Sequence, residues 1–381
     1  MRVKWWVSGV VRAAGLAALL VHCGCVTVYE GQRRASRASA PVRTRAASAP
    51  QPAPGPPAAR PQPRPRLPPG PPPVRFPLAP AAPPAAEAAP HPSAPASFRT
   101  ILAVQAFLDR RNLSCGSIDG VLGSRTRAAL KAWQTTQGGP ATGEMDQGIV
   151  QAAAGMPDAF ATREVTEQEH AALTIVPDSW VAKSRRPRLG YQTILETVAE
   201  QSHASEGAIR RLNPGVEWPD PPAGTRLVAP NPRPAIRAAK AARLTIQIRR
   251  KTILAYDAAG GLMGLFPCSI AQKVEKIPTG ELRVANCAAN PDYTFDPALF
   301  VEDPEARTIA GKLRIPPGPN NPVGVAWIGL SLPGYGMHGT PKPEDIGKTE
   351  SHGCFRLANW NAAKLLRMVW IGLPVTMDWS E

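Results

Sequence analysis

Residues 98–156 carry the spacing of apolar and polar positions that is typical of helices. Two sets of positions recur at this spacing: Ile101, Val104, Gln105 and Leu108, then Thr126, Ala129, Leu130 and Trp133. Residues 118–123 between them are rich in turn formers, and Ser124 is placed to cap the second helix. A third short helix is expected to begin near residues 141–146. The pattern predicts a small bundle of three helices.

Strand patterns replace the helical ones beyond residue 243. Residues 244–248 alternate apolar and polar side chains, residues 253–256 do so loosely, and Gly260-Gly261 indicates a hairpin. A further strand is expected at 323–330, and the clearest amphipathic helix at 360–370. The pattern predicts a β-rich domain over residues 243–379. Its long insertion, residues 286–318, is expected to form a lid or the wall of a cleft.

The pattern is weaker between these two regions, over residues 175–232. Residues 195–201 and 208–213 favour two short helices, and residues 223–230 favour a turn and a short strand. No first strand is recognisable near residues 180–191. A small βααβ module and a helical connector are both compatible with this pattern.

Composition distinguishes residues 26–97 from the rest. The chain holds 45 prolines and a net charge of +15, and much of the proline lies between residues 40 and 95. A segment without a periodic apolar face buries too little surface to offset its chain entropy. We therefore expect a disordered linker, extended by at most about 3.1 Å per residue. Its arginines either keep the tail soluble or attract anionic headgroups and carboxylate-rich polymers.

The first 25 residues have the layout of an export signal. Basic residues near the start precede an apolar core at residues 13–21, which is shorter than the roughly 20 residues that span a bilayer. The following Gly24-Cys25 pair resembles a bacterial lipoprotein cleavage site, although His22 stands where an aliphatic residue is usual. The resemblance implies an exported protein of the periplasm or cell envelope, anchored in the membrane by a lipid on Cys25. A plain cleaved signal and an uncleaved anchor are the alternatives.

Four cysteines lie beyond the signal: Cys115, Cys268, Cys287 and Cys354. Exported proteins often contain disulfides. Cys268 and Cys287 share a domain and are the plausible pair, with burial as free thiols as the alternative.

Cys354 stands in a string that favours catalysis. Residues 351–356 read Ser-His-Gly-Cys-Phe-Arg, and His338 lies upstream in Met-His-Gly-Thr. A thiolate attacks carbonyl carbons, and a nearby imidazole lowers the pKa of the thiol. The string therefore predicts a nucleophile, Cys354, with its own base. A zinc site made by His338, His352 and Cys354 and an inert buried cysteine are the alternatives.

Together with its surroundings, this string closely resembles the signature of YkuD-like L,D-transpeptidase catalytic domains, HGT followed by S-HGC-hydrophobic-R. Residues 276–281 look like the family's T-P-T-G-E segment, with Ile277 in place of Thr. Residues 357–362 and 372–377 resemble its closing helix and strand. The resemblance covers residues 243–378 and implies a β-rich sandwich, with Cys354 as nucleophile and His338 as proton acceptor and donor. It assigns oxyanion or substrate support to Ser351, His352, Gly353, Arg356 and Gly339, and it implies no metal or cofactor.

The two upstream modules also resemble cell-wall modules. Residues 98–156 look like the three-helix peptidoglycan-binding domain with the pattern Q-x-x-L…DG-x-x-G-x-x-T-x-x-A. Residues 175–232, through Leu-Asn-Pro-Gly at 212–215, resemble LysM, a βααβ module that binds N-acetylglucosamine glycans. The predicted chain is multidomain: a β-rich catalytic sandwich preceded by a three-helix peptidoglycan-binding domain and a LysM-like module.

These resemblances imply peptidoglycan, its tetrapeptide stems and glycan strands, as the partner, and no nucleic acid. In the family's reaction, the cysteine attacks a tetrapeptide stem, D-Ala leaves, and a second diaminopimelate amine resolves the thioester into a 3–3 crosslink. Resolution by water (an L,D-carboxypeptidase or hydrolase), resolution by a lipoprotein lysine and an inactive wall-binding anchor stay open. A papain-like or NlpC/P60-like peptidase is disfavoured, because there the nucleophile precedes its histidine.

Overall fold

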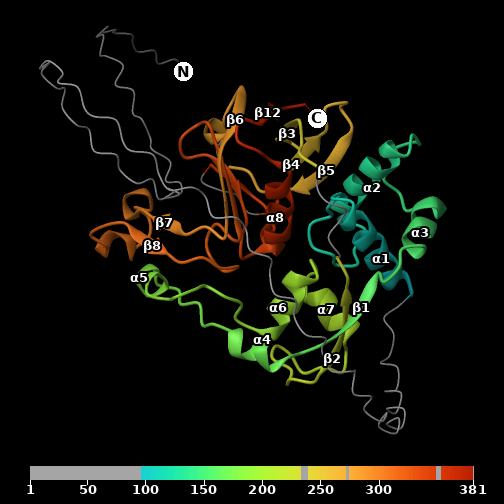
Figure 1. Ribbon diagram of the computed structural model, residues 1–381, viewed down its shortest axis with the longest axis horizontal. Helices are drawn as coiled ribbons and strands as arrows, with labels where there is room; N and C mark the ends of the chain where they lie inside the picture. The colour runs from blue at the N-terminus through green and yellow to red at the C-terminus, as the bar shows by residue number, and fades with distance from the viewer. Residues whose placement is uncertain (1–95, 233–238, 272–273, 349–352, 381) are drawn as a thin grey trace, which may run out of the picture. The chain divides into compact units, whose positions relative to one another are not determined.

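The computed structural model describes residues 96–380 except 233–238, 272–273 and 349–352 (Figure 1). The predicted signal, Cys25 and nearly all of the predicted linker lie outside the described residues. The described residues belong to one compact unit. None of the helices in this part of the chain has both the length and the apolar character needed to span a bilayer.

The first module is the predicted three-helix bundle, made of α1 (Ala96–Arg110), α2 (Ser124–Thr136) and α3 (Gln147–Ala154). Gln105 of α1 donates to Asp119 Oδ1 at 2.8 Å, which fastens the loop before α2. Asp146 caps α3 by accepting from the Ile149 amide. The prediction that Ser124 caps α2 is wrong: the helix begins at Ser124 itself, so Gly123 is the N-cap and no side chain caps it.

The second module contains two antiparallel strands around short helices. The elements are β1 (Phe160–Glu164), α4 (Glu167–Ala172), α5 (Trp180–Ser184), α6 (Ile194–Gln201), α7 (Glu206–Leu212) and β2 (Arg226–Pro230). Helices α6 and α7 and strand β2 agree with the sequence pattern. The partner of β2 is β1, with Phe160 opposite Pro230. That first strand lies upstream of residues 180–191, the region in which a first strand was expected. Residues 180–184 of that region form helix α5 instead.

The third module is β-rich, as predicted. Its strands form an eight-stranded sheet in the order β11-β10-β9-β6-β12-β3-β4-β5. They are β3 (Arg243–Gln247), β4 (Thr252–Tyr256), β5 (Leu262–Pro267), β6 (Glu281–Ala289), β9 (Ala326–Leu330), β10 (Gly336–His338), β11 (Phe355–Arg356) and β12 (Pro374–Asp378). Helix α8 (Asn359–Met368) closes the core.

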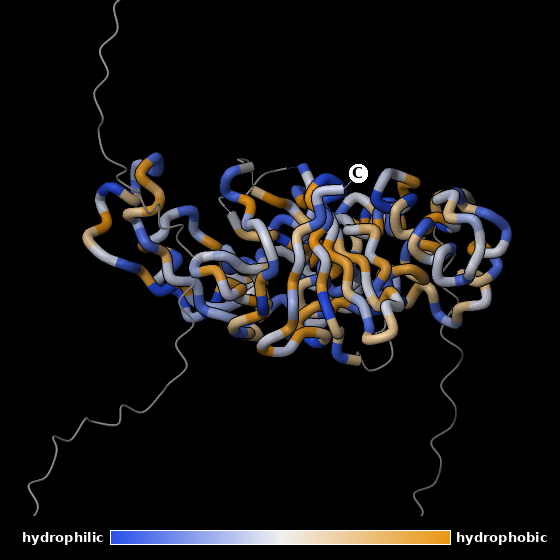
Figure 2. Tube along the Cα trace, turned by 90° about the horizontal axis from the view of Figure 1, so that it is seen from above, coloured by the Kyte–Doolittle hydropathy of each residue, from blue (hydrophilic) through white to orange (hydrophobic). Residues whose placement is uncertain are grey.

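Strand β6 joins two halves of this sheet. Its first residues pair with β12 and its last residues with β9, with a register shift between Val284 and Asn286. Ile246 of β3, Ile328 of β9 and Leu365 of α8 are fully buried in one apolar core. The two halves therefore pack as a sandwich, with apolar positions concentrated along the central strands in Figure 2.

The insertion forms a small hairpin, β7 (Tyr293–Phe295) paired with β8 (Leu313–Ile315). The second module holds it in place. The Trp180 ring of α5 stacks on Phe295 with centroids 4.1 Å apart. Trp180 Nε1 also donates to Asp303 Oδ2 at 2.8 Å. Cys354 belongs to the same buried cluster as Phe295 of this hairpin.

Cys115, Cys268, Cys287 and Cys354 are all free thiols. Cys268 is fully buried and Cys287 is partly buried. Of the two alternatives for this pair, a disulfide or free thiols, the structure has free thiols.

Candidate active site

The two predicted catalytic residues lie at the ends of a parallel strand pair: β10 ends at His338, and β11 begins directly after Cys354. In the register of β10 and β11, Met337 lies opposite Phe355 and His338 opposite Arg356. Side chains alternate between the faces of a strand. Met337 and Phe355 point into the apolar core, where both are fully buried. His338 and Arg356 therefore face the other side. Cys354 directly precedes β11 and belongs to the same buried cluster as Trp327, the residue opposite His338.

Trp327 of β9 contacts this face. It lies opposite His338 in the antiparallel pairing of β9 with β10. Its ring stacks on the imidazole with centroids 5.8 Å apart, and its Nε1 donates to Asn286 Oδ1 at 2.9 Å. Trp327 and Cys354 belong to one buried cluster. The tryptophan thus fixes the plane of the imidazole beside the cysteine, a role that the sequence analysis did not assign.

The hydrogen bonding of His338 leaves one ring nitrogen able to accept a proton. Nδ1 lies 2.7 Å from the carbonyl oxygen of Gly339, which can only accept, so Nδ1 donates. In the neutral ring, Nε2 then carries the lone pair. Burial lowers the pKa of His338 to about 4; the bond to Gly339 acts in the opposite direction, and the Arg356 cation lowers the pKa further. His338 is therefore a neutral base at physiological pH.

The thiol of Cys354 is buried but borders the loop before β10. The side chain is 8% exposed, and Sγ donates to the Gly334 carbonyl at 3.5 Å. Gly334 lies in the loop between β9 and β10. This loop therefore accepts a hydrogen bond from Cys354 and continues along the chain into the strand that ends at His338. Gly353, directly before the nucleophile, is buried. Ser351 and His352 lie outside the described residues, and so does any zinc site that would include His352.

Gly339 supports the histidine. Its amide donates to the Ala326 carbonyl at 3.1 Å, and its carbonyl accepts from His338. The Gly339 N–H is already used in the sheet, and the assignment of Gly339 to substrate or oxyanion support stays a prediction.

Asn359, at the start of α8, requires glycine at position 339. A Cβ at residue 339 would lie 2.2 Å from Asn359 Oδ1. That oxygen accepts from the Val325 amide at 3.1 Å, and Nδ2 donates to the Pro319 carbonyl at 3.1 Å. The buried amide thus joins α8 to the segment that leads into β9. No feature of the sequence beyond the family-like string around it indicated this function.

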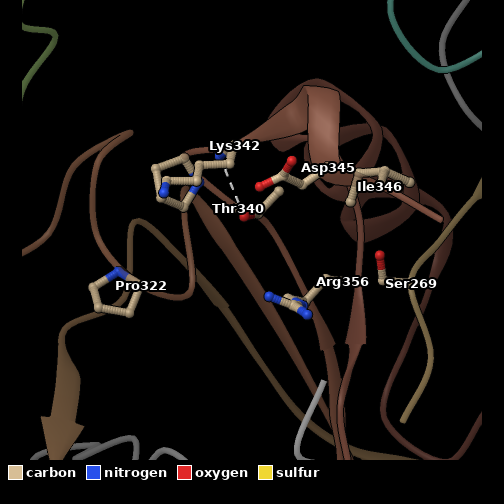
Figure 3. Close-up of a pocket in the computed structure, with 8 residues that line it drawn as sticks. Ser269, Pro322, Thr340, Lys342, Asp345, Ile346 and Arg356 are labelled. Carbon is tan, nitrogen blue, oxygen red and sulfur yellow. Dashed lines mark hydrogen bonds between the residues drawn. The ribbon is translucent and has the colours of Figure 1, made fainter. Parts of the chain in front are cut away.

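A pocket of about 170 Å³ opens beside Arg356 and Thr340 (Figure 3). Its lining consists of Ser269, Pro322, Thr340, Pro341, Lys342, Asp345, Ile346 and Arg356. Arg356 and Lys342 supply two cations and Asp345 one anion. Asp345 attracts the guanidinium of Arg356. The two cations and one anion give the lining a formal charge of +1. Such a pocket suits a carboxylate. Sequence reasoning singled out Arg356 but missed Lys342 and Ser269.

Comparisons with known proteins agree with this arrangement. Residues 241–377 match the model of the YkuD family, described as the L,D-transpeptidase catalytic domain. Residues 100–152 match the model described as "Putative peptidoglycan binding domain".

Similar proteins carry corresponding names. The "Putative L,D-transpeptidase YkuD" of Bacillus licheniformis is 25% identical over 183 residues, which are 48% of this chain and 92% of that protein. A Fuscovulum blasticum protein, "Putative L,D-transpeptidase in ATP synthase subunits region ORF 5", is 30% identical over 32% of this chain and 60% of its own length. A crystal structure of the L,D-transpeptidase from Xylanimonas cellulosilytica aligns with 76% of this chain and 98% of its own, with 15% identity and a TM-score of 0.31.

Proposed function

We propose that this protein, an enzyme whose residues 241–377 are an L,D-transpeptidase catalytic domain, forms a thioester on Cys354 with a peptidoglycan tetrapeptide stem and transfers it to a second stem. The observation that supports this most is the state of His338. It is buried, and its Nδ1–H bonds to the Gly339 carbonyl. The pKa of its ring, lowered to about 4, leaves Nε2 free of a proton at neutral pH, ready to accept the one on the thiol.

The first half-reaction forms the acyl-enzyme. The thiol proton of Cys354 passes to Nε2 of His338, and the sulfur attacks the carbonyl of the L,D bond between diaminopimelate and terminal D-Ala. The negative charge of the tetrahedral intermediate falls on the carbonyl oxygen, beside the backbone amides around Cys354. Collapse breaks the C–N bond, and the leaving D-Ala amine takes the proton from His338. The product is a thioester and free D-Ala.

The second half-reaction resolves the thioester. The side-chain amine of another diaminopimelate attacks the thioester carbonyl and gives a proton to His338. The Cys354 thiolate leaves and recovers that proton, and a 3–3 crosslink results. In this scheme Arg356 and Lys342 hold a stem carboxylate in the pocket, and Asp345 attracts the guanidinium of Arg356.

The remaining modules deliver this reaction to the wall. The peptidoglycan-binding domain at residues 100–152 binds the enzyme to the polymer on which it acts. The antiparallel pair β1–β2 with helices α6 and α7 between them supports a LysM-like glycan-binding module. Export to the cell envelope, with a lipid on Cys25 as membrane anchor, fits both.

The test is muropeptide analysis by mass spectrometry after intact sacculi are incubated with the full-length protein. We expect new 3–3 dimers with the wild type and none with Cys354→Ala. The variant should still sediment with sacculi, because its wall-binding modules are unchanged. If tripeptides form without dimers, water resolves the thioester and the activity is that of a carboxypeptidase and not of a transpeptidase. Identical profiles from wild type and variant would leave a wall-binding anchor.

A further inference from the structure

The peptidoglycan-binding module is built onto the edge of the catalytic sheet. The Ser114 amide donates to the Leu265 carbonyl at 2.9 Å, and the Leu265 amide donates to the Asn112 carbonyl at 2.8 Å. Leu265 belongs to β5, the outermost strand on that side. Its side chain and that of Leu254 complete the apolar core of the three-helix bundle. The module therefore covers an edge that would otherwise expose unpaired backbone groups.

One contact of this module lands next to the active site instead of on the edge. Arg125, in the first turn of α2, donates from Nη2 to the carbonyl of Ile346. Ile346 is buried and lines the pocket beside Arg356. It belongs to residues 341–348, the start of the connection that runs from His338 to Cys354. We call residues 341–348 the linking loop.

The linking loop is held from two other sides. The Gly347 amide donates to Ser269 Oγ at 2.8 Å, and Lys251 Nζ donates to the Gly347 carbonyl at 3.2 Å. Ser269 in turn exchanges two backbone bonds with Arg356, of 2.9 and 3.1 Å. Gly347 and Ser269 therefore connect Ile346 by hydrogen bonds to Arg356 of β11, two residues from Cys354.

We infer that Arg125 is a positioning residue for acyl transfer: the peptidoglycan-binding module sets the linking loop, and through it the geometry of Cys354 and the pocket. This inference deepens the proposed function, and it rests on that function because acyl transfer is the proposed activity. The hydrogen bond from Arg125 to Ile346 does not depend on that function. A guanidinium suits this task, because its planar fork loses little freedom for each bond that it makes.

The chain offers a matched control on the same helix. Arg127 is two residues further along α2, and its partner is Glu144 within the peptidoglycan-binding module. Both members of that pair are exposed. Arg127→Ala therefore removes an arginine and an ion pair from the same helix without touching the linking loop.

The experiment compares full-length wild type, Arg125→Ala, Arg125→Lys and Arg127→Ala. Acylation by imipenem is followed by intact mass, and hydrogen–deuterium exchange is followed in the peptide that covers residues 341–348. We expect Arg125→Ala to slow acylation about 10- to 100-fold and to speed exchange in the linking loop. Sedimentation with sacculi and the melting temperature should stay close to wild type. Arg125→Lys should recover part of the rate, since an ammonium can still donate to the Ile346 carbonyl.

Unchanged exchange in Arg125→Ala, or equal acylation rates for Arg125→Ala and Arg127→Ala, would overturn the inference. A wild type that imipenem does not acylate would count against the proposed function instead. In that case, the exchange data would still decide whether Arg125 positions the loop.

Discussion

Two histidines of this chain, His338 buried and His203 partly buried, each stack on a tryptophan but have different partners. His203 lies on Trp360 with ring centroids 5.4 Å apart, and its Nδ1 donates to Asp109 Oδ2 at 2.8 Å. His338 lies on Trp327, and its Nδ1 donates to a backbone carbonyl. Burial lowers the pKa of both rings. Asp109 opposes this at His203, whereas Arg356 adds to it at His338.

At His203 a carboxylate offsets part of the effect of burial. Burial alone would raise the pKa of Asp109, but Lys364 and His203 hold it well below its usual range. Lys364 Nζ lies 2.7 Å from Asp109 Oδ1 and donates to the Asp109 backbone carbonyl at 2.8 Å. These residues come from three modules: α1, the turn after α6, and α8. The cluster therefore ties the modules together. The imidazole of His338 has a neutral carbonyl in place of a carboxylate, which keeps it uncharged and ready to accept a proton.

The largest expected difference between the two histidines is in catalysis. His338→Gln should slow acylation of Cys354 by imipenem about 10²- to 10⁴-fold, because the proton acceptor is lost. His203→Gln should leave that rate near wild type but lower the free energy of unfolding by about 1–3 kcal/mol, because Asp109 loses a buried donor. Intact mass and chemical denaturation measure the two effects. Equal acylation rates for the two variants would contradict the assignment of His338 as base.

The next effect is on stability. Lys364→Ala leaves the buried Asp109 with a weaker set of partners and should lower the free energy of unfolding by about 3–5 kcal/mol. Lys312→Ala is the matched control: its pair with Asp296 is exposed, with 65% of the lysine side chain accessible, and should cost about 0–1 kcal/mol. Similar losses in the two variants would mean that the Asp109 cluster does not hold the modules together.

The smallest effect is a shift in pH dependence. A base must be unprotonated, and the pKa of His338 is lowered to about 4, so acylation should persist below pH 6.5 and fall only as the pH approaches 4. Arg356→Gln removes the cation that disfavours protonation, so its acid limb should move to higher pH. Rates of imipenem acylation between pH 4 and 8 measure both. An acid limb near 6.5 in the wild type would show that the imidazole is solvated.

Local pattern predicted much of this molecule. Periodicity placed α1, α2, α6 and α8, alternation placed β3 and β4, and the glycine pair at 260–261 placed the hairpin from β4 to β5. The string around Cys354 predicts a nucleophile and its base, which stay predictions; the parallel pairing of β10 with β11 sets His338 opposite Arg356, two residues from Cys354.

What the sequence did not predict depends on contacts between distant residues. Strand β1 was missed because a short strand is recognisable chiefly through its partner, here more than sixty residues away. Arg125 meets Ile346 across 221 positions, and Lys364 meets Asp109 across 255. Each of these side chains reads as an ordinary solvated charge in the sequence, because only packing of the modules supplies its partner.

The most direct test of the central claim is to trap the acyl-enzyme. The full-length protein is mixed with a disaccharide-tetrapeptide, quenched in acid within seconds and digested, and the peptide that contains Cys354 is weighed. We predict a mass gain equal to the donor minus D-Ala on that cysteine, no gain in Cys354→Ala and a strongly reduced gain in His338→Gln. Release of D-Ala without any adduct on Cys354, or an adduct that persists in Cys354→Ala, would contradict the account.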